Sequence, residues 1–168
     1  ASLLYADDHD GRLARSAHSA FAHRQPPWGR ALAPYLGITD ETRWTNLFTG
    51  VYRCPSQKPP KNWSYGQNVY FELDPAYDDY AGSPRTWRRV TQLPRPVATI
   101  LHAEVPGTGD HVMAHFWTTP ETLSDLDARR HAGRANYSFA DGHAERRPLE
   151  QTYAPTNSVD AWNPLTAR

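Results

Sequence analysis

The most continuous run of apolar side chains lies at residues 97–105 (VATILHAEV), between Pro96 and Pro106. A short, β-branched apolar run bounded by prolines is typical of a strand that is buried on both faces. We therefore expect a central strand here. Aromatic and polar residues are mixed over 63–73 and 112–117, and this composition predicts two further strands.

A β-hairpin is the clearest local signal in the chain. Residues 135–140 (ANYSFA) alternate Tyr137 and Phe139 with small or polar residues, and Asp141-Gly142 precedes a second short run at 143–146. Asp-Gly between two such runs favours a type I′ turn, in which both central residues have positive φ. The sequence thus predicts a hairpin within 131–146.

The predicted helices are short. Residues 1–10 predict the end of an N-terminal helix, and 29–36 predict a helix closed by Gly37 in a left-handed C-cap. Acidic residues in the first turn favour a further helix from 39 or 40 to 49. Acidic residues early and basic residues late favour another within 120–130.

Three segments are predicted to be irregular. Prolines interrupt 51–62 and 75–84, which we expect to be loops. The tail at 153–168 has no period, and Trp162 is expected to anchor it to the domain. Together these elements predict a loop-rich α+β fold in one domain spanning 1–168.

Composition and charge narrow the classes of protein. The chain has 168 residues with 18 Lys+Arg against 18 Asp+Glu, so no bulk positive field favours binding to nucleic acid or to an acidic membrane. Ten glycines and 15 prolines are too few for a low-complexity chain. The sequence contains no apolar stretch long enough for a transmembrane helix. These values favour a globular domain.

Several short motifs occur in a particular order. They are LLYADDHDG at the start, RCPS at 53–56, SYGQN at 64–68, and His131 followed nine residues later by Asp141-Gly142. This order resembles the prepilin-like proteins with a C-terminal H-X9-DG motif, which are related to type II secretion pseudopilins and type IV pilins. The family's cleavage site and apolar N-terminal helix do not occur in the sequence, so we expect this chain to be the head of such a protein.

The resemblance implies a pilin-like α+β fold, with a truncated N-terminal helix packed on a small antiparallel sheet. It implies a structural subunit of a cell-envelope or extracellular filament, not an enzyme. The expected partners are copies of itself or sibling pilin-like subunits and the assembly machinery. Membrane contact is expected only through the missing helix, and no nucleic acid is expected.

The motif residues His131, Asn136, Asp141 and Gly142 are expected to be structural. Asp141 is expected in the turn, and the His131 ring is expected to bond the hairpin backbone or Asp141. No cofactor is expected. Glu104, Asp141 and His143 are weak candidates for binding calcium or another divalent ion, although no EF-hand spacing is present.

Cys54 is the only cysteine in the chain. No histidine or asparagine can be paired with it from the sequence, so a buried thiol is favoured over a nucleophile. A disulfide to a cysteine in an upstream helix is a further hypothesis, which follows from the cell-envelope setting that the resemblance implies.

Two other functions stay open. Six tryptophans could bind an envelope polysaccharide by stacking on sugar rings, although scattered tryptophans more often fill a core. A metal-dependent hydrolase would need Glu104, His131, Asp141 and His143 around one ion in an open cleft.

Overall fold

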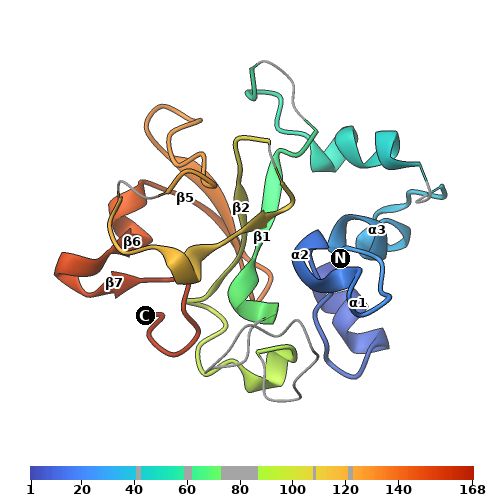
Figure 1. Cartoon of the computed structure of the whole chain (residues 1–168), viewed down its shortest axis with the longest axis horizontal. Coiled ribbons are helices and arrows are strands. Elements are labelled where there is room, and N and C mark those ends of the chain that lie inside the picture. Colours follow the sequence, from blue (N-terminus) through green and yellow to red (C-terminus); the bar gives the residue numbers. More distant parts are fainter. Residues whose placement is uncertain (41–42, 59–61, 73–86, 108, 121–122) are drawn as a thin grey trace.

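The computed structural model describes residues 1–168 except 41–42, 59–61, 73–86, 108 and 121–122. The fold is α+β, with few and short helices and one mostly antiparallel sheet (Figure 1). The helices are α1 (Ser2–Asp8), α2 (Ala17–Ala20) and α3 (Trp28–Leu32). The strands are β1 (Tyr65–Asn68), β2 (Ile100–Glu104), β3 (His111–Val112), β4 (Ala135–Phe139), β5 (Ala144–Arg147), β6 (Tyr153–Ala154) and β7 (Val159–Asp160). Single 3₁₀ turns occupy Pro34–Leu36, Trp44–Phe48, Gly50–Tyr52, Val69–Glu72, Val90–Gln92, Ala114–Phe116, Leu149–Gln151 and Pro155–Asn157.

The main sheet has the order β3-β1-β2-β4-β5, in which only the β1–β3 pair is parallel. The predicted central strand is confirmed, because β2 lies in the middle of this order and is mostly buried. It is shorter than expected: the residues after Pro96 form a turn, in which the Thr99 hydroxyl donates to the carbonyl of Arg95.

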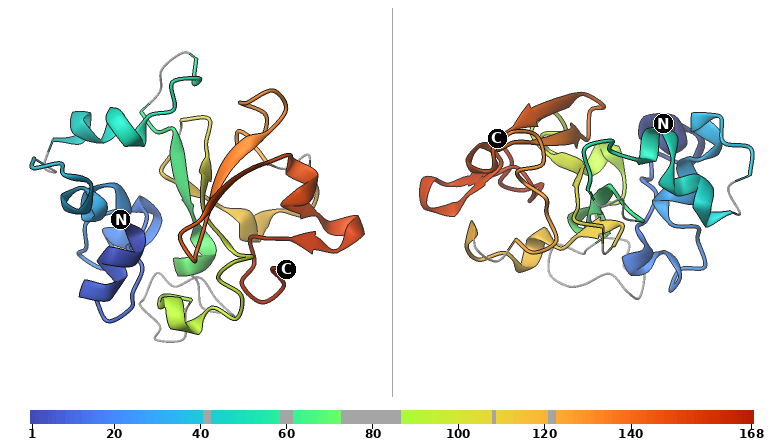
Figure 2. Two further views of the ribbon diagram at one scale, coloured as in Figure 1. Left: turned by 180° about the vertical axis from the view of Figure 1, so that it is seen from behind. Right: turned by 90° about the horizontal axis from the view of Figure 1, so that it is seen from above.

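The three short helices lie together on one side of the sheet, and the C-terminal segment lies on the other (Figures 1 and 2). One apolar cluster around Trp28 and Leu47 packs between the N-terminal segments and the sheet. A second, around Tyr137 and Trp162, joins the sheet to the C-terminal segment. The sheet is therefore covered by apolar contacts on both faces.

Two carboxylates hold the N-terminal segment onto the sheet. The backbone N–H of Ser16 donates to Glu72, and that of Ala17 donates to Asp110, at 2.6 Å and 2.9 Å. These N–H groups open α2 and have no partner within a helix. Carboxylates from distant segments thus satisfy them and fix where α2 lies.

The predicted N-terminal helix and the helix closed by Gly37 are confirmed as α1 and as α3 with its following 3₁₀ turn; Gly37 has φ of 73°. The helix expected from 39 or 40 to 49 is a 3₁₀ turn at Trp44–Phe48, with 41–42 outside the described residues. Of the helix expected within 120–130, residues 121–122 lie outside the described residues, and no helix forms over 123–130. There the Asp125 carboxylate accepts from the backbone of Met113 and the indole of Trp117, so it stabilises a turn.

The strands expected over 63–73 and 112–117 are both cut short by 3₁₀ turns. Asn68 ends β1: its side-chain amide donates to the carbonyls of Ile100 and Trp162, and its oxygen accepts from the N–H of Tyr70. An Asn that bonds the backbone two residues ahead favours a turn over a continued strand.

The tail is less irregular than expected, because β6 and β7 form a small antiparallel pair. Trp162 is fully buried, as predicted. The loop predicted at 51–62 begins within the Gly50–Tyr52 turn, and its residues 59–61 lie outside the described residues. The loop predicted at 75–84 lies wholly outside them.

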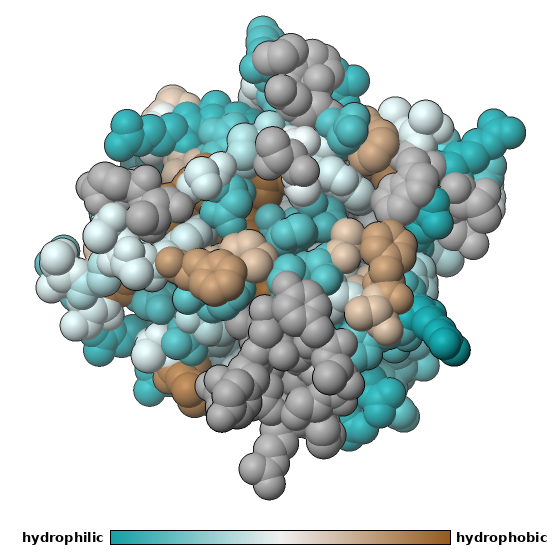
Figure 3. All heavy atoms as spheres, viewed as in Figure 1, coloured by the Kyte–Doolittle hydropathy of each residue, from teal (hydrophilic) through white to brown (hydrophobic). Residues whose placement is uncertain are grey.

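Hydrophobic residues on the face shown in Figure 3 are scattered among hydrophilic ones. Within the described ranges, no helix has the length and apolar character that crossing a bilayer requires.

Candidate functional site

The His131 backbone lies in a tight turn just before β4. The N–H of His131 donates to the carbonyl of Arg134 at 2.8 Å, and the reverse bond measures 3.2 Å. The two residues between them, Ala132 and Gly133, have φ of 52° and 83°. Positive φ at both central positions is the pattern expected at Asp141-Gly142, and it occurs here instead. This turn fixes where the His131 ring leaves the chain.

The His131 ring contacts Glu104 on the central strand. Its Nε2 lies 2.8 Å from Oε1 of Glu104, which is fully buried at the end of β2. The prediction that this ring bonds the hairpin backbone or Asp141 was therefore wrong. The other oxygen of Glu104 accepts from the backbone N–H of Asn136 at 2.9 Å, so Asn136 contributes through its main chain.

Cys54 lies against the same nitrogen. Its Sγ is 3.4 Å from Nε2 of His131, and the residue is 2% exposed, which confirms the buried thiol. The Tyr65 hydroxyl also bonds Cys54, and burial, with the nearby Cys54 and Glu104, raises the pKa of Tyr65 to about 12. Sequence reasoning missed this contact, because Cys54 and His131 are 77 positions apart and no local pattern links them.

Arg130 is a further neighbour of Glu104 in this cluster. Its guanidinium lies 3.4 Å from Oε1 of Glu104, and it also donates to Asp127 and to the carbonyls of Ser64 and Val105. Its side chain is only 2% exposed. The buried Glu104 carboxylate thus has a buried cation beside it.

Asp141 and His143 lie together at the other end of β4, in the hairpin turn. Oδ1 of Asp141 is 2.6 Å from Nδ1 of His143. Although burial acts to raise the pKa of Asp141, the hydrogen bonds from His143 hold it below its ordinary value. The hydrolase alternative requires four residues around one ion, but they form two separate pairs: Glu104 with His131, and Asp141 with His143.

The hairpin itself is confirmed, but its turn is of another type. The N–H of Gly142 donates to the carbonyl of Phe139, and the N–H of Phe139 donates to the carbonyl of His143. Of Asp141 and Gly142, only Gly142 has positive φ, at 97°. This is the pattern of a three-residue loop with glycine in the left-handed position. A Cβ at Gly142 would lie 3.0 Å from Cδ1 of Leu3 in α1.

Nε2 of His131 faces both the thiol and the carboxylate. In a cysteine–histidine–acid catalytic group, one ring nitrogen takes the proton of the nucleophile, and the acid accepts a hydrogen bond from the other ring nitrogen. The cluster does not have that geometry. Cys54, Glu104 and His131 could surround a metal ion. In the part of the chain that the structure describes, they form the one group of three or more His, Cys, Asp or Glu side chains that could do so.

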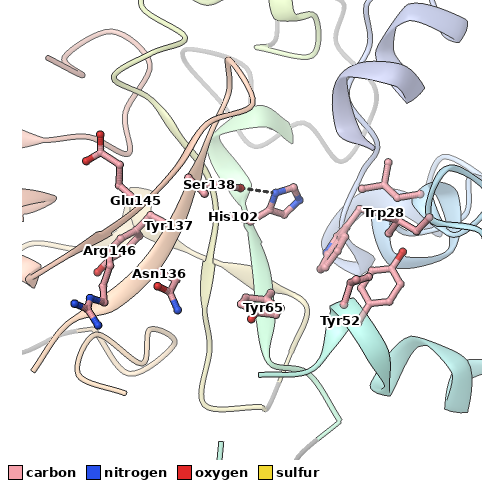
Figure 4. Close-up of a pocket in the computed structure, with 13 residues that line it drawn as sticks. Trp28, Tyr52, Tyr65, His102, Asn136, Tyr137, Ser138, Glu145 and Arg146 are labelled. Carbon is pink, nitrogen blue, oxygen red and sulfur yellow. Dashed lines mark hydrogen bonds between the residues drawn. The ribbon is translucent and has the colours of Figure 1, made fainter. Parts of the chain in front are cut away.

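A separate cleft of about 470 Å³ lies between the N-terminal segments and β4–β5 (Figure 4). Trp28 and Tyr52 line one wall, and Asn136 and Arg146 line the other. His102 points across it from β2, with Nδ1 3.0 Å from the Ser138 hydroxyl.

The tryptophans whose burial the structure describes offer little exposed indole surface. Trp28, Trp117 and Trp162 are buried, and Trp63 and Trp87 are half-buried. A polysaccharide function would therefore depend on the cleft more than on exposed indole faces.

Comparison with known proteins gives no match to a protein family, to a curated protein sequence or to a solved structure. The resemblance to prepilin-like proteins accordingly stays a prediction from the ordered motifs.

Proposed function

We propose that this chain is the head domain of a pilin-like structural subunit, belonging to a filament of the cell envelope or the cell exterior. The partners would be copies of the chain or sibling subunits, added by a secretion-type or pilus-type assembly machinery. In such subunits an apolar N-terminal helix packs against the helices of neighbouring subunits, and α1 would be the end of that helix.

The observation that carries this proposal is that both ends of the H-X9-DG segment have structural contacts. At one end, His131 binds Glu104 and ties the start of the hairpin to the central strand. At the other end, the missing Cβ of Gly142 leaves room for Leu3 of α1. The hairpin would then transmit force between the N-terminal helix and the sheet, which is what a filament head requires.

The experiment uses the gene product in its own cell. We expect its mature N-terminus to carry an apolar helical run of about 20 residues continuous with α1, and the protein to co-sediment with sheared surface filaments. A variant with a charged residue in the middle of that run would be the control for assembly. A cleaved export signal directly before Ala1, with release of a monomer, would contradict the proposal.

A second candidate is the binding of an envelope polysaccharide, which the cleft favours. Aromatic walls beside an amide and a guanidinium offer both stacking and hydrogen bonding to a sugar. Titration with oligosaccharides should then change tryptophan fluorescence, and Arg146→Ala should weaken that change. Fluorescence that stays constant over the whole titration would reject this candidate.

A further inference from the structure

Three donor atoms of different chemistry lie close together near the start of β4. They are a thiol from Cys54, a carboxylate from Glu104 at the end of β2 and an imidazole from His131 before β4. All three atoms lie within 4.8 Å of one another. Because the residues come from three distant parts of the chain, the fold and not the local sequence creates the cluster.

Hydrogen bonds to His131 alone do not account for this arrangement, although the Tyr65 hydroxyl also bonds Cys54. A ring nitrogen has either one proton or one lone pair, so Nε2 of His131 can serve the carboxylate or the thiol well, but not both. Yet Oε1 of Glu104 is 2.8 Å away and Sγ of Cys54 is 3.4 Å away. An ion between them would satisfy all three at once.

One of the two short distances in the cluster suits a tetrahedral ion, and the other is too short for it. Metal–donor bonds of about 2.0–2.3 Å place neighbouring donors about 3.3–3.7 Å apart. The separation of Sγ and Nε2 is within this range. The separation of Nε2 and Oε1 would have to open by about half an ångström.

We propose that Cys54, Glu104 and His131 bind a divalent transition-metal ion of the zinc class. Thiolate and imidazole ligands favour such an ion over calcium or magnesium, which take oxygen ligands. On binding, the thiol of Cys54 loses its proton to solvent and Nε2 of His131 gives its lone pair. Thiolate and carboxylate together then balance the two positive charges of the ion in a buried place.

The surroundings of the cluster fit this role. The N–H of Asn136 holds Oε2 of Glu104, which leaves Oε1 for the ion. Arg130 has other acceptors in Asp127, Ser64 and Val105, so it can give up its long contact to Oε1. The His131 side chain is 21% exposed, which provides a path for the ion and for a water ligand.

This inference uses the same His131–Glu104 pair as the filament proposal, but its test does not depend on assembly into a filament. It also changes the sequence-based expectation of the ligands. Of Glu104, Asp141 and His143, only Glu104 takes part, and the other ligands are Cys54 and His131. The ion would join three segments around the sheet and so stabilise the head.

Cobalt(II) is the probe, because a thiolate–cobalt bond gives a near-ultraviolet charge-transfer band and tetrahedral coordination gives strong visible bands. Cys54 is the only cysteine, so a charge-transfer band reports this cluster alone. We expect one cobalt per chain, displaced by zinc, in protein without an affinity tag. Titration of the unaltered chain without a thiolate band would overturn the proposal.

Variants give a second readout. Cys54→Ser should abolish the band, and His131→Gln should weaken zinc binding by more than the roughly 10–100-fold that loss of an outer partner costs. His143→Gln is the matched control, because His143 pairs with Asp141 in the hairpin turn. Equal loss of zinc binding in His143→Gln and His131→Gln would assign the ion to the surface and refute the site.

If Cys54→Ser does not fold, alkylation of the unaltered chain decides the matter. Zinc should slow the reaction of Cys54 with iodoacetamide in mild denaturant at least tenfold, and a chelator should reverse this. A rate of alkylation that is unchanged by zinc would overturn the proposal.

Discussion

Glu72 is a fully buried carboxylate that accepts hydrogen bonds from the backbone of Ser16, from the Ser19 hydroxyl and from the Gln67 amide. Glu72→Ala would remove the acceptor of the Ser16 N–H and of the Ser19 hydroxyl, whereas the Gln67 amide would keep its bond to the carbonyl of Ala14. We expect it to lower the free energy of unfolding by about 2–4 kcal/mol. Denaturant titration measures this change.

Glu72→Gln is the matched control, since its amide oxygen can still accept from Ser16. It should cost clearly less than Glu72→Ala. Equal losses for the two variants would show that an amide oxygen in the same place does not replace the carboxylate, and would contradict the role given to the hydrogen bond from Ser16.

His102 predicts how stability depends on pH. Burial lowers its pKa from 6.5 to about 4, and its Nε2 has no hydrogen-bond partner among the described residues. The unfolded chain therefore binds the proton at a higher pH than the folded chain does. The contribution of His102 is complete above pH 6.5 and falls between pH 6.5 and 4, by close to 1.4 kcal/mol per pH unit at its steepest.

His102→Gln removes the titration and should flatten this part of the curve of unfolding free energy against pH. An NMR titration of the unaltered chain should place the pKa of the ring near 4. A ring that titrates near 6.5, with an unchanged slope in the variant, would contradict the prediction.

The sequence could predict single residues only where the local pattern decides their role. Gly37 and Gly142 were found from turn chemistry, and Trp162 from its position in a polar tail. The partner of His131 could not be found this way, because its contact to Glu104 depends on which strands are neighbours. Cys54 was correctly predicted to be buried, but its contact with His131 was missed for the same reason.

At the scale of elements, Leu3 of α1 lies close to Gly142 in the turn of the β4–β5 hairpin. Gly142→Ala would pay about 1–2 kcal/mol for its positive φ and would also press against Cδ1 of Leu3. Gly133→Ala is the matched control, because Gly133 has φ of 83° and no atom near its missing Cβ. We expect Gly142→Ala to cost more than Gly133→Ala.

A double-mutant cycle isolates the contact. In a Leu3→Ala background, the excess cost of Gly142→Ala should disappear, with a coupling of about 0.5–1 kcal/mol. Purely additive effects would mean that α1 does not rest on the hairpin, and they would remove the main support of the filament proposal.

The boundaries of elements depended on side chains that the local pattern could not place. The apolar run after Pro96 correctly indicated the central strand. The strand that begins at Tyr65 was predicted too long, because the bonds from Asn68 to Ile100 and Trp162 exist only once the sheet and tail have assembled. The charge pattern of 120–130 favours a helix. Asp125 instead accepts hydrogen bonds from Met113 and Trp117, and these bonds stabilise a turn.

At the scale of the whole molecule, Trp63 connects the two largest apolar clusters. It packs against the cluster around Trp28 on one side and against the cluster around Trp162 on the other. The centroid of its ring lies 5.7 Å from the ring centroid of Trp28 and 5.2 Å from that of Phe48. Such a link should make the helical layer and the sheet unfold together, in one transition.

Gly29 in α3 tests this link, because a Cβ there would lie 2.9 Å from Cη2 of Trp63. Gly29→Ala should raise helix propensity by up to about 1 kcal/mol, but the contact with Trp63 opposes this gain, so we expect a net loss of stability. Trp63→Phe removes the atoms that clash. In that background, Gly29→Ala should become stabilising, and both probes of unfolding, circular dichroism and tryptophan fluorescence, should still coincide. If Gly29→Ala has the same sign in both backgrounds, then Trp63 does not join the two layers as this fold requires.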